Sequence, residues 1–227
     1  MSGDRSPLGE ADSEIAREAE EFENMAWVTL AYDRAAVNAA SKVLFKAYSE
    51  DGDDWDWNEY SKAWEIITNW RSAHSFPLNT LQNGLRAKAK LITSDFLVAQ
   101  RIKRLSSIEA KLERFPSMKL SQMQDIGGCR AIMPSVAEVT ELVRLYKKGN
   151  GRHRLASEDD YISAPRASGY RGVHFIYGYY SDRNDKYNSL KIEIQIRSAL
   201  QHAWATAVET VGTFTQQALK SSIGEAE

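Results

Sequence analysis

Beyond residue 94, short runs of β-branched and aromatic residues alternate with amphipathic helical patterns, and this alternation restricts the fold more than any other feature of the chain. Strands are expected in LVAQRIKR (97–104), GGCRAIM (127–133), VHFIYGYY (173–180) and LKIEIQIR (190–197). Helices are expected in SSIEAKLERF (106–115), SVAEVTELVRLYKK (135–148) and ALQHAWATAVETV (199–211). The alternation predicts an α+β fold in which a mixed β-sheet is flanked by helices.

The residues before this alternation have helical periodicity instead. After a polar start (1–12), expected to be disordered, apolar residues from Ile15 to Leu30 recur at helical spacing behind a cap at Asp12 or Ser13. Asp33 opens a second helix, which the acidic segment SEDGDDWD (49–56) ends. We expect a helical N-terminal region (13–94), a catalytic unit (95–212) and a helical C-terminal tail (213–227).

A third helical pattern carries an aromatic stripe. Its members return every three or four positions: Trp57, Tyr60, Trp64, Ile67 and Trp70. We interpret the stripe as a core face rather than an aromatic binding platform. A further helix is expected from Pro77 to residue 93, because proline is tolerated in the first turn of a helix.

Composition narrows the class of protein. A single cysteine, Cys129, excludes an internal disulfide and, with only 4 histidines, a cysteine-rich zinc site. No apolar stretch is long enough to span a membrane and no signal peptide opens the chain, so a cytoplasmic protein without a membrane partner is expected. Residues 1–65 hold 6 basic and 16 acidic side chains, whereas residues 66–227 hold 23 and 15. The basic part suits a phosphate-bearing ligand, although solvated lysines would give the same balance.

Polar residues at strand positions suggest a phosphate site. In LKIEIQIR, Glu193, Gln195 and Arg197 share one face and the isoleucines the other, a pattern that a solvent-facing strand would also show. Arg101 and Lys103 end an earlier strand, and Ser107 and Lys111 follow one helical turn apart. Asp125 precedes a Gly127-Gly128 turn, with Arg130 on the following strand. Asp125 and Glu193 could hold Mg²⁺, although Asp125 could also be a turn or helix cap.

The segment DDYISAPRASGYRGVHF (159–175) adds a tyrosine between two glycines and near a histidine. Tyr170 offers a ring on which a base could stack, and His174 follows four residues later, although a lone Tyr or His is more often structural. The chain has no GxxxxGK[ST] loop, so side chains and metal would have to neutralise any triphosphate.

Four blocks of the chain, in order, resemble the synthetase domain of the RelA/SpoT family: RIKRLSSIEAKLER, QDIGGCRAIM, DYISAPRASGYRGVH and EIQIRSALQHAWATAVE. The resemblance implies a nucleotidyltransferase-like sheet and an enzyme that uses Mg²⁺ to move the pyrophosphate of ATP onto a ribose 3′-hydroxyl. It makes Asp125 and Glu193 the catalytic and metal-binding carboxylates. It assigns ATP to Arg101, Lys103, Ser107, Lys111 and Arg130, and the acceptor to Arg166, Tyr170, His174, Gln195 and Arg197.

Three departures from the family pattern concern the nucleotides. Asp159 stands where guanosine alarmone synthetases usually have a lysine, so it reverses the charge where the acceptor's 5′-phosphates would be held. Gly172 replaces a common serine, and Glu138 stands about where an adenine-packing arginine is often found. The reversal at Asp159 disfavours GDP or GTP as the acceptor.

The segments on either side of these blocks resemble the toxic small alarmone synthetase branch, which is found in toxin-antitoxin and phage-defence systems. That resemblance implies tRNA as acceptor, modified at its 3′ CCA end so that translation stops, and an antitoxin protein or domain as partner. The basic stretches LRAKAK (85–90) and YKKGNGRHR (146–154) could meet the tRNA backbone or be a solvated face.

Other interpretations stay open. The acceptor could be GDP, GTP or an adenosine nucleotide, which would make an alarmone, or the domain could be an inactive nucleotide-binding module. No hydrolase activity is expected, because the chain has no His-Asp dipeptide. The acidic N-terminal helices could be a lid or a packing flank. Relatives continue past this C-terminus into a further helix, so a truncated tail is expected.

Overall fold

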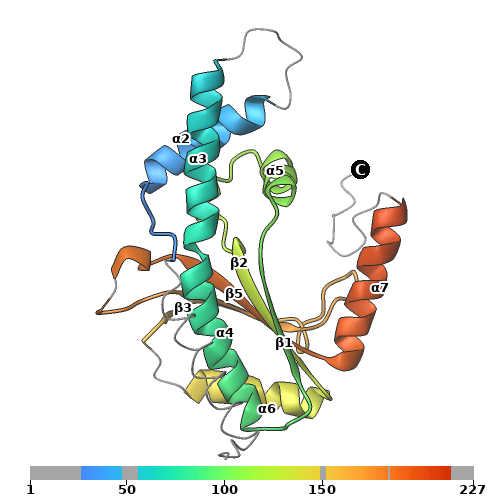
Figure 1. The fold of residues 1–227 in the computed structure, drawn as a ribbon. Coiled ribbons are helices and arrows are strands. Elements are labelled where there is room, and N and C mark those ends of the chain that lie inside the picture. Colours follow the sequence, from blue (N-terminus) through green and yellow to red (C-terminus); the bar gives the residue numbers. More distant parts are fainter. Residues whose placement is uncertain (1–26, 48–55, 149–151, 184, 216–227) are drawn as a thin grey trace, which may run out of the picture.

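A computed structural model describes residues 27–47, 56–148, 152–183 and 185–215 of the chain (Figure 1). Its centre is a five-stranded sheet in the order β1-β2-β5-β4-β3. The strands are β1 (Leu97–Ile102), β2 (Gly127–Met133), β3 (Arg154–Asp160), β4 (Val173–Gly178) and β5 (Lys191–Ser198). Only β2 and β5 pair in parallel, and the other neighbours are antiparallel. The expected α+β fold with a mixed, helix-flanked sheet is confirmed.

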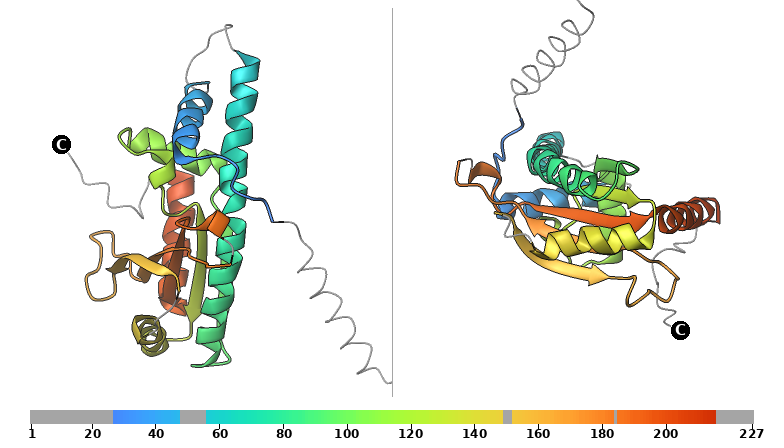
Figure 2. Two further views of the ribbon diagram at one scale, coloured as in Figure 1. Left: turned by 90° about the vertical axis from the view of Figure 1, so that its left-hand side faces the viewer. Right: turned by 90° about the horizontal axis from the view of Figure 1, so that it is seen from below.

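Two helices cover one face of this sheet, here called the reverse face. They are α4 (Ser75–Lys90) and α6 (Val136–Lys148), whose buried residues share one core with the sheet. In the view from below in Figure 2, α6 is the yellow helix beside the strands. Leu85 of α4 and Leu142 of α6 are fully buried against Ile192 and Ile194 of β5. Because α4 shares this core with the sheet, the end of the N-terminal region is a packing flank rather than a lid.

A second core joins several further helices to the end of the sheet. It lies among α2 (Arg34–Ala47), α3 (Trp57–Ala73), α5 (Leu105–Arg114) and the short helices η1 (Leu120–Gln122) and η2 (Asp185–Tyr187). The helices α3 and α4 follow each other end to end as one long rod, which Figure 1 shows in front of the strands. This core holds α5 and the start of β2 in place, and both carry residues of the candidate site.

The start of the chain was predicted correctly only in part. Residues 27–32 are not helical, so the first predicted helix does not reach Leu30, and its earlier part and the disordered start lie outside the described residues. Asp33 does cap α2, since its Oδ1 accepts a hydrogen bond of 2.7 Å from the backbone N–H of Ala36. The acidic segment also ends in a cap, because Asp56 accepts hydrogen bonds from the first turn of α3.

The aromatic stripe of α3 is a core face only in its second half. Ile67 and Trp70 are buried, but Trp57 is 72% exposed and Trp64 is 45% exposed. The helical period was predicted correctly, and the interpretation as one continuous buried face was wrong. The short helix α2 is the neighbour of this end of α3, and Ala63 is the α3 residue buried there.

Strand β3 was missed by the sequence analysis. It pairs only with β4, at the edge of the sheet, and six of its seven residues are polar or alanine. The helix α7 (Ala199–Thr215) continues past residue 212, and Figure 1 shows it beside the sheet, apart from α4. Among the helices of the described part of the chain, none is long and apolar enough to cross a membrane.

Candidate active site

The face of the sheet opposite α4 and α6, here called the polar face, carries the side chains that the sequence pattern separated from the core. On β5 the three isoleucines are fully buried on the reverse side. The intervening side chains therefore lie on the polar face: Glu193, Gln195 and Arg197. The predicted alternation of this strand is confirmed.

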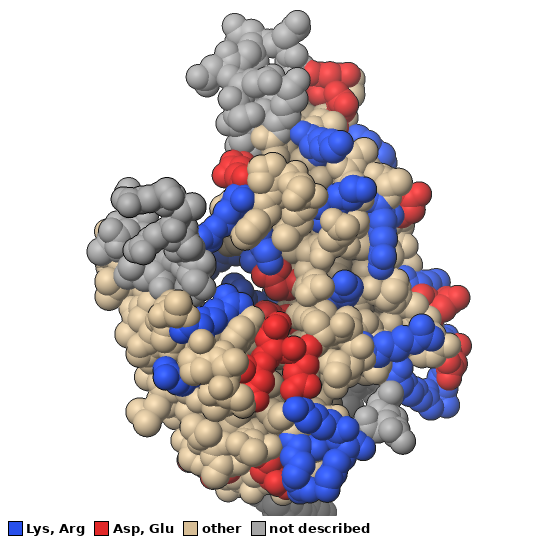
Figure 3. Space-filling view, turned by 180° about the vertical axis from the view of Figure 1, so that it is seen from behind, with Lys and Arg blue, Asp and Glu red and all other residues tan. Residues whose placement is uncertain are grey.

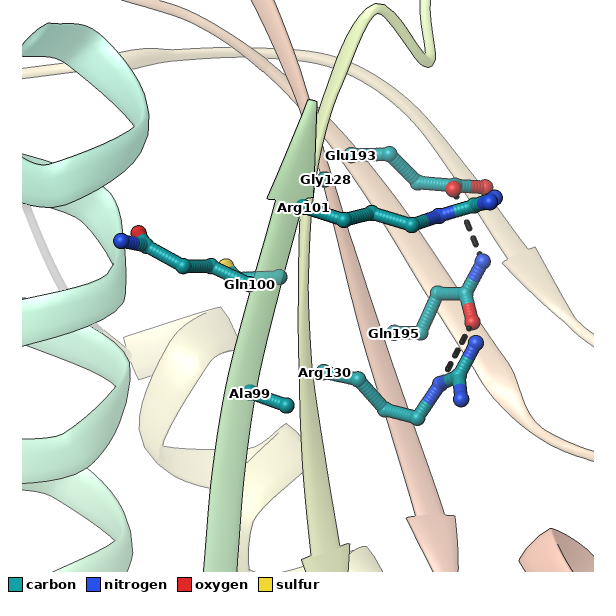
Figure 4. Close-up of a pocket in the computed structure, with 8 residues that line it drawn as sticks. Ala99, Gln100, Arg101, Gly128, Arg130, Glu193 and Gln195 are labelled. Atoms are coloured by element: carbon teal, nitrogen blue, oxygen red, sulfur yellow. Dashed lines mark hydrogen bonds between the residues drawn. The ribbon is translucent and has the colours of Figure 1, made fainter. Parts of the chain in front are cut away.

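Strand register brings Arg101 and Glu193 into one pocket. Arg101 of β1 lies opposite Gly128 of β2, and Gly128 lies opposite Glu193 of β5. Because Gly128 has no side chain, the other two can approach each other above it. Figure 4 shows four side chains on this side of the strands, while Gln100 points to the other side: Arg101, Arg130, Glu193 and Gln195.

The next row across the sheet runs from Arg130 through Gln195 and His174 to Asp159. The Gln195 Oε1 atom accepts a hydrogen bond of 3.0 Å from Arg130 Nε and one of 2.6 Å from an Arg197 guanidinium nitrogen. Burial lowers the pKa of Arg197, and the neighbouring Arg130 charge acts in the same direction. Two guanidinium groups thus share one neutral acceptor, an arrangement that an anionic ligand would stabilise.

Asp125 lies just before β2, between two lysines. Its Oδ2 accepts from Lys103 Nζ at 2.9 Å, and its Oδ1 accepts from Lys111 Nζ of α5 at 2.9 Å. Burial raises the pKa of Asp125, but the two lysine charges outweigh it, so the pKa lies below its usual value. Ser107 lies in the first turn of α5, half-buried, one helical turn before Lys111. The four residues that the sequence grouped here are thus on adjacent elements.

Glu193 is the second carboxylate of the polar face and is held on both oxygens. Its Oε1 lies 3.0 Å from His174 Nδ1, and its Oε2 accepts from Gln195 Nε2 at 2.8 Å. Burial and the Asp125 charge raise the pKa of Glu193, but the hydrogen bonds from His174 and Gln195 prevail and lower it. The His174 Nε2 atom in turn lies 2.5 Å from the Tyr170 hydroxyl. The Glu193 carboxyl is therefore ionised at neutral pH and fixed in orientation.

Tyr170 is buried, with 4% of its surface exposed. The Arg197 guanidinium lies 4.8 Å from the centre of its ring, and the Arg166 guanidinium lies 6.0 Å from it. Arg166 stacks more closely on Tyr161, at 4.2 Å, and also donates a hydrogen bond to the Tyr161 hydroxyl. A base could stack on Tyr170 only after these arginine side chains moved aside.

The sequence analysis predicted a turn at Gly127-Gly128. In the structure these two glycines are the start of β2, so that prediction was wrong. A Cβ atom on Gly127 would come within 2.7 Å of Ile192 Cδ1. Any other residue at this position would therefore displace the Ile192 side chain from its place between β2 and the helices.

Gly172 allows a second close approach. A Cβ atom at this position would lie 3.1 Å from Arg197 Cγ and 3.2 Å from the Tyr170 hydroxyl oxygen. The absence of a side chain at Gly172 lets Arg197 lie against Tyr170.

Sequence reasoning missed Tyr161 as part of this site. Its ring contacts Tyr170 and His174 edge-on, with centroid distances of 5.7 and 5.4 Å. The signal that could have found it was its position directly after β3, next to the acidic end of that strand (158–160). The missed strand hid that position.

Basic side chains outnumber carboxylates on the polar face. The group comprises Arg101, Lys103, Lys111, Arg130, Arg166 and Arg197, with Asp125, Glu193 and the exposed Asp159 as the acidic members. Figure 3 shows Lys and Arg side chains on both sides of a hollow, with acidic side chains beside it. An excess of positive charge in a hollow attracts polyanions such as a nucleoside triphosphate.

The residues present fit a magnesium ion. Mg²⁺ is usually bound by one or two carboxylates together with water and substrate phosphates. Asp125 and Glu193 provide two ionised carboxylates that feel each other's charge. Among the described residues no cluster of three Asp, Glu, His or Cys side chains forms, so water and phosphate oxygens would complete the coordination.

The fold and the polar face define a class: an α+β domain whose mixed sheet presents two carboxylates among clustered Arg and Lys side chains. A family model described as "Region found in RelA / SpoT proteins" matches residues 100–216, about half of the chain. The chain belongs to this family. The family resemblance stated from the sequence is thereby confirmed, whereas the toxic branch remains a prediction.

Individual relatives agree with this assignment. GTP pyrophosphokinase YwaC of Bacillus subtilis (strain 168) is 30% identical over 112 residues, which are 47% of this chain and 52% of the relative. The chain thus spans about half the length of the curated relatives it matches. A GTP pyrophosphokinase family protein from Streptococcus pneumoniae is 30% identical, with a TM-score of 0.54 over 62% of this chain and 73% of that one.

The small alarmone synthetase 2 from Bacillus subtilis shares the fold. Its TM-score is 0.57 at 24% identity, and the match covers 66% of this chain and 82% of that one. The family match begins near β1, so it concerns the sheet and the polar face more than the N-terminal helices.

Proposed function

We propose that this protein is a Mg²⁺-dependent pyrophosphokinase that transfers the pyrophosphate of ATP to a ribose 3′-hydroxyl. The observation that carries the proposal is that Asp125 and Glu193 lie close enough for the charge of one to act on the other, among six basic side chains. Transfer of a phosphoryl-type group depends on positioning and charge neutralisation more than on a covalent intermediate.

ATP would lie over β1, β2 and α5. Lys103 and Lys111, which hold Asp125 in this structure, are placed to turn to the β- and γ-phosphates once a metal replaces them on that carboxylate. Ser107 lies between them, and Arg101 and Arg130 border the pocket beside Glu193. When bound between Asp125 and Glu193, Mg²⁺ would neutralise phosphate charge and hold the triphosphate in line.

The reaction balances without a protein nucleophile. The acceptor 3′-oxygen forms a bond to the β-phosphorus of ATP, and the bond from that phosphorus to the oxygen bridging the α-phosphate breaks. AMP leaves with that oxygen, and the hydroxyl proton passes to a base or to water. Because its pKa is lowered, the Glu193 carboxylate is a weak base. It is therefore better suited to accepting a hydrogen bond from the 3′-hydroxyl than to removing the proton of that hydroxyl completely.

For the acceptor, we propose the 3′-terminal adenosine of tRNA. Asp159 lies on the polar face, exposed, directly opposite His174 in the sheet register. A carboxylate there repels the 5′-diphosphate of GDP, but tRNA brings no 5′-diphosphate to the pocket. Such an enzyme would stop translation as a toxic small alarmone synthetase with a role in phage defence, and would need an antitoxin as partner.

A guanosine nucleotide is the second candidate acceptor, because relatives with 30% identity are named GTP pyrophosphokinases.

The two basic stretches do not favour tRNA over a guanosine nucleotide. LRAKAK lies on α4, and the described parts of YKKGNGRHR lie on α6 and at the start of β3. Both helices cover the reverse face, away from the carboxylates.

The test is transfer of label from γ-labelled ATP with Mg²⁺. Parallel reactions receive deacylated tRNA, GDP, GTP or no additional acceptor. In the last of these, ATP itself is the only possible acceptor. The products are separated into RNA and nucleotides. Label on tRNA at its 3′ end supports the first acceptor, and label on a guanosine or adenosine nucleotide overturns it while keeping the pyrophosphokinase. Labelled product that persists on further incubation agrees with the expected lack of hydrolase activity. Label on no acceptor refutes the proposed reaction and leaves an inactive nucleotide-binding module.

A further inference from the structure

The reverse face contains a cavity that the proposed reaction does not use. It lies between α4, α6 and the β3–β4 edge of the sheet, and its volume is about 390 Å³. Cavities that bind small organic ligands usually measure roughly 300–1,000 Å³, so this one matches a single small molecule rather than a chain segment. Six of its lining residues bear on the choice of ligand: Gly84, Lys88, Tyr146, His153, Phe175 and Tyr177.

The cavity has an aromatic wall. Tyr146 of α6 stacks on Phe175 of β4 with a centroid distance of 5.5 Å and an interplanar angle of 17°, and Tyr177 lies 6.0 Å from Tyr146. Burial raises the pKa of both tyrosines, so both hydroxyl groups stay protonated. Phe175 is 1% exposed and backs this wall, so the surface that a ligand can reach comes from the half-buried Tyr146 and Tyr177, whose rings and hydroxyl donors suit a flat heteroaromatic ring.

One cation at the cavity lacks an acidic partner. The Lys88 Nζ atom lies 5.3 Å from the centre of the Tyr146 ring, and no carboxylate pairs with it within the described ranges. Lys147, by contrast, pairs with Glu158 at 2.7 Å. His153 Nδ1 accepts a hydrogen bond of 3.2 Å from the Tyr180 backbone, so its other ring nitrogen is the one free to donate. Lys88 and His153 are thus available to an anionic group.

Gly84 widens the cavity at a cost to the helix. It lies in the interior of α4, and a Cβ atom added there would meet nothing within 4 Å. Alanine would therefore fit, and a glycine inside a helix lowers stability relative to alanine. Packing of the protein does not require a glycine here, but access of a ligand to the aromatic wall would.

We propose that this cavity binds a mononucleotide, with its base against Tyr146 and Tyr177 and its phosphate at Lys88. An uncharged ring would leave Lys88 unpaired, and inorganic phosphate would leave the aromatic wall uncovered. The site is separate from the polar face, because Phe175 and Tyr177 point to the opposite side of β4 from His174.

The experiment is calorimetric titration of the full chain with AMP and with GMP, and with adenosine and inorganic phosphate as partial ligands. Lys88→Gln should weaken mononucleotide binding about tenfold, as expected for one charge-assisted contact. Gly84→Leu should abolish it by filling the cavity. Lys90→Gln, which removes an exposed lysine of the same helix outside the cavity, is the matched control and should change nothing.

Binding at the proposed catalytic site is separated by Arg101→Ala on the polar face. A mononucleotide that still binds this variant, and is lost on adding Gly84→Leu, supports the reverse-face site. Binding that disappears with Arg101→Ala and ignores Lys88→Gln overturns it. Absence of binding up to about 1 mM also overturns it. If adenosine alone or inorganic phosphate alone binds as tightly as AMP, the proposal that the site recognises both the ring and the charge is contradicted.

Folding is checked with Gly84→Ala. This variant should melt about 2 °C higher than the parent, since alanine stabilises a helix interior relative to glycine and a gain of that size shifts the melting temperature by this order. If Gly84→Ala melts lower than the parent, the added methyl group meets other atoms. There is then no open space beside Gly84, and the proposed cavity does not exist in that form.

Discussion

Replacing Glu193 by glutamine tests the polar face most directly, because the surrounding hydrogen bonds determine how the new side chain must orient. Gln195 Oε1 already accepts from Arg130 and Arg197, so the Gln195 amide cannot turn over. Its Nε2 atom keeps donating toward position 193, and the new oxygen must accept there. The new –NH₂ group then faces His174 Nδ1, at the 3.0 Å distance now held by Glu193 Oε1.

His174 can accommodate this change by moving its proton. With Nδ1 as acceptor, Nε2 carries the proton and donates to the Tyr170 hydroxyl. Both contacts survive as neutral hydrogen bonds, so Glu193→Gln should lower the free energy of unfolding by only about 1–2 kcal/mol. For a chain of this size that corresponds to a fall in melting temperature of about 2–8 °C.

The effect on catalysis should be much larger. Loss of one charged group that acts in the transition state costs about 10²–10³ in turnover. ATP affinity should stay within about threefold, since the cations that bind phosphate are unchanged. The assay combines label transfer, ATP titration and thermal melting. Glu158→Gln is the matched control, because Glu158 pairs with Lys147 away from the polar face. Turnover above a tenth of the parent value would refute the role of Glu193, and melting more than about 8 °C lower would refute the hydrogen-bond argument.

Three further outcomes are expected. Burial lowers the pKa of His74 from 6.5 to about 4, so between these pH values the unfolded chain binds a proton that the folded chain does not. In urea titrations, the free energy of unfolding should therefore be unaffected above pH 6.5 and fall by about 3 kcal/mol as pH is lowered to 4. His74→Asn should not show this fall. Asp159→Lys should raise the use of GDP relative to tRNA about tenfold in kcat/KM, and an unchanged ratio would remove Asp159 from the acceptor argument. Leu85→Ala should lower the free energy of unfolding by about 2–5 kcal/mol in denaturant titration, because Leu85 is fully buried between α4 and the sheet; a loss below about 1 kcal/mol would contradict that core.

Local sequence pattern was enough to predict most of the sheet. The isoleucines of β5 alternate strictly because this strand is central and buried on the reverse face. β3 escaped notice because an edge strand exposes much of its surface, and RLASEDD has one large apolar residue, Leu155. Trp57 and Trp64 show the opposite limit: helical period predicts which side chains share a face, but the presence of a neighbour to cover that face depends on the rest of the fold.

The residues of the candidate site were predictable, but their contacts were not. Asp125 is 22 residues from Lys103 and 14 from Lys111, and only the placement of α5 beside the start of β2 joins them. Tyr170 was predicted as a free stacking ring, and its burial depends on Arg197 from a distant strand. Spacing along the chain carries no information about such long-range pairs.

Gly172 also constrains how this protein can change over evolutionary time. A serine there, common in the family, would press on Arg197 Cγ at 3.1 Å and on the Tyr170 hydroxyl. Arg197 or the Tyr170 hydroxyl would have to move by a few tenths of an ångström before position 172 could accept a side chain. The two positions are therefore coupled: a substitution of Gly172 succeeds only together with a small shift of Arg197 or Tyr170.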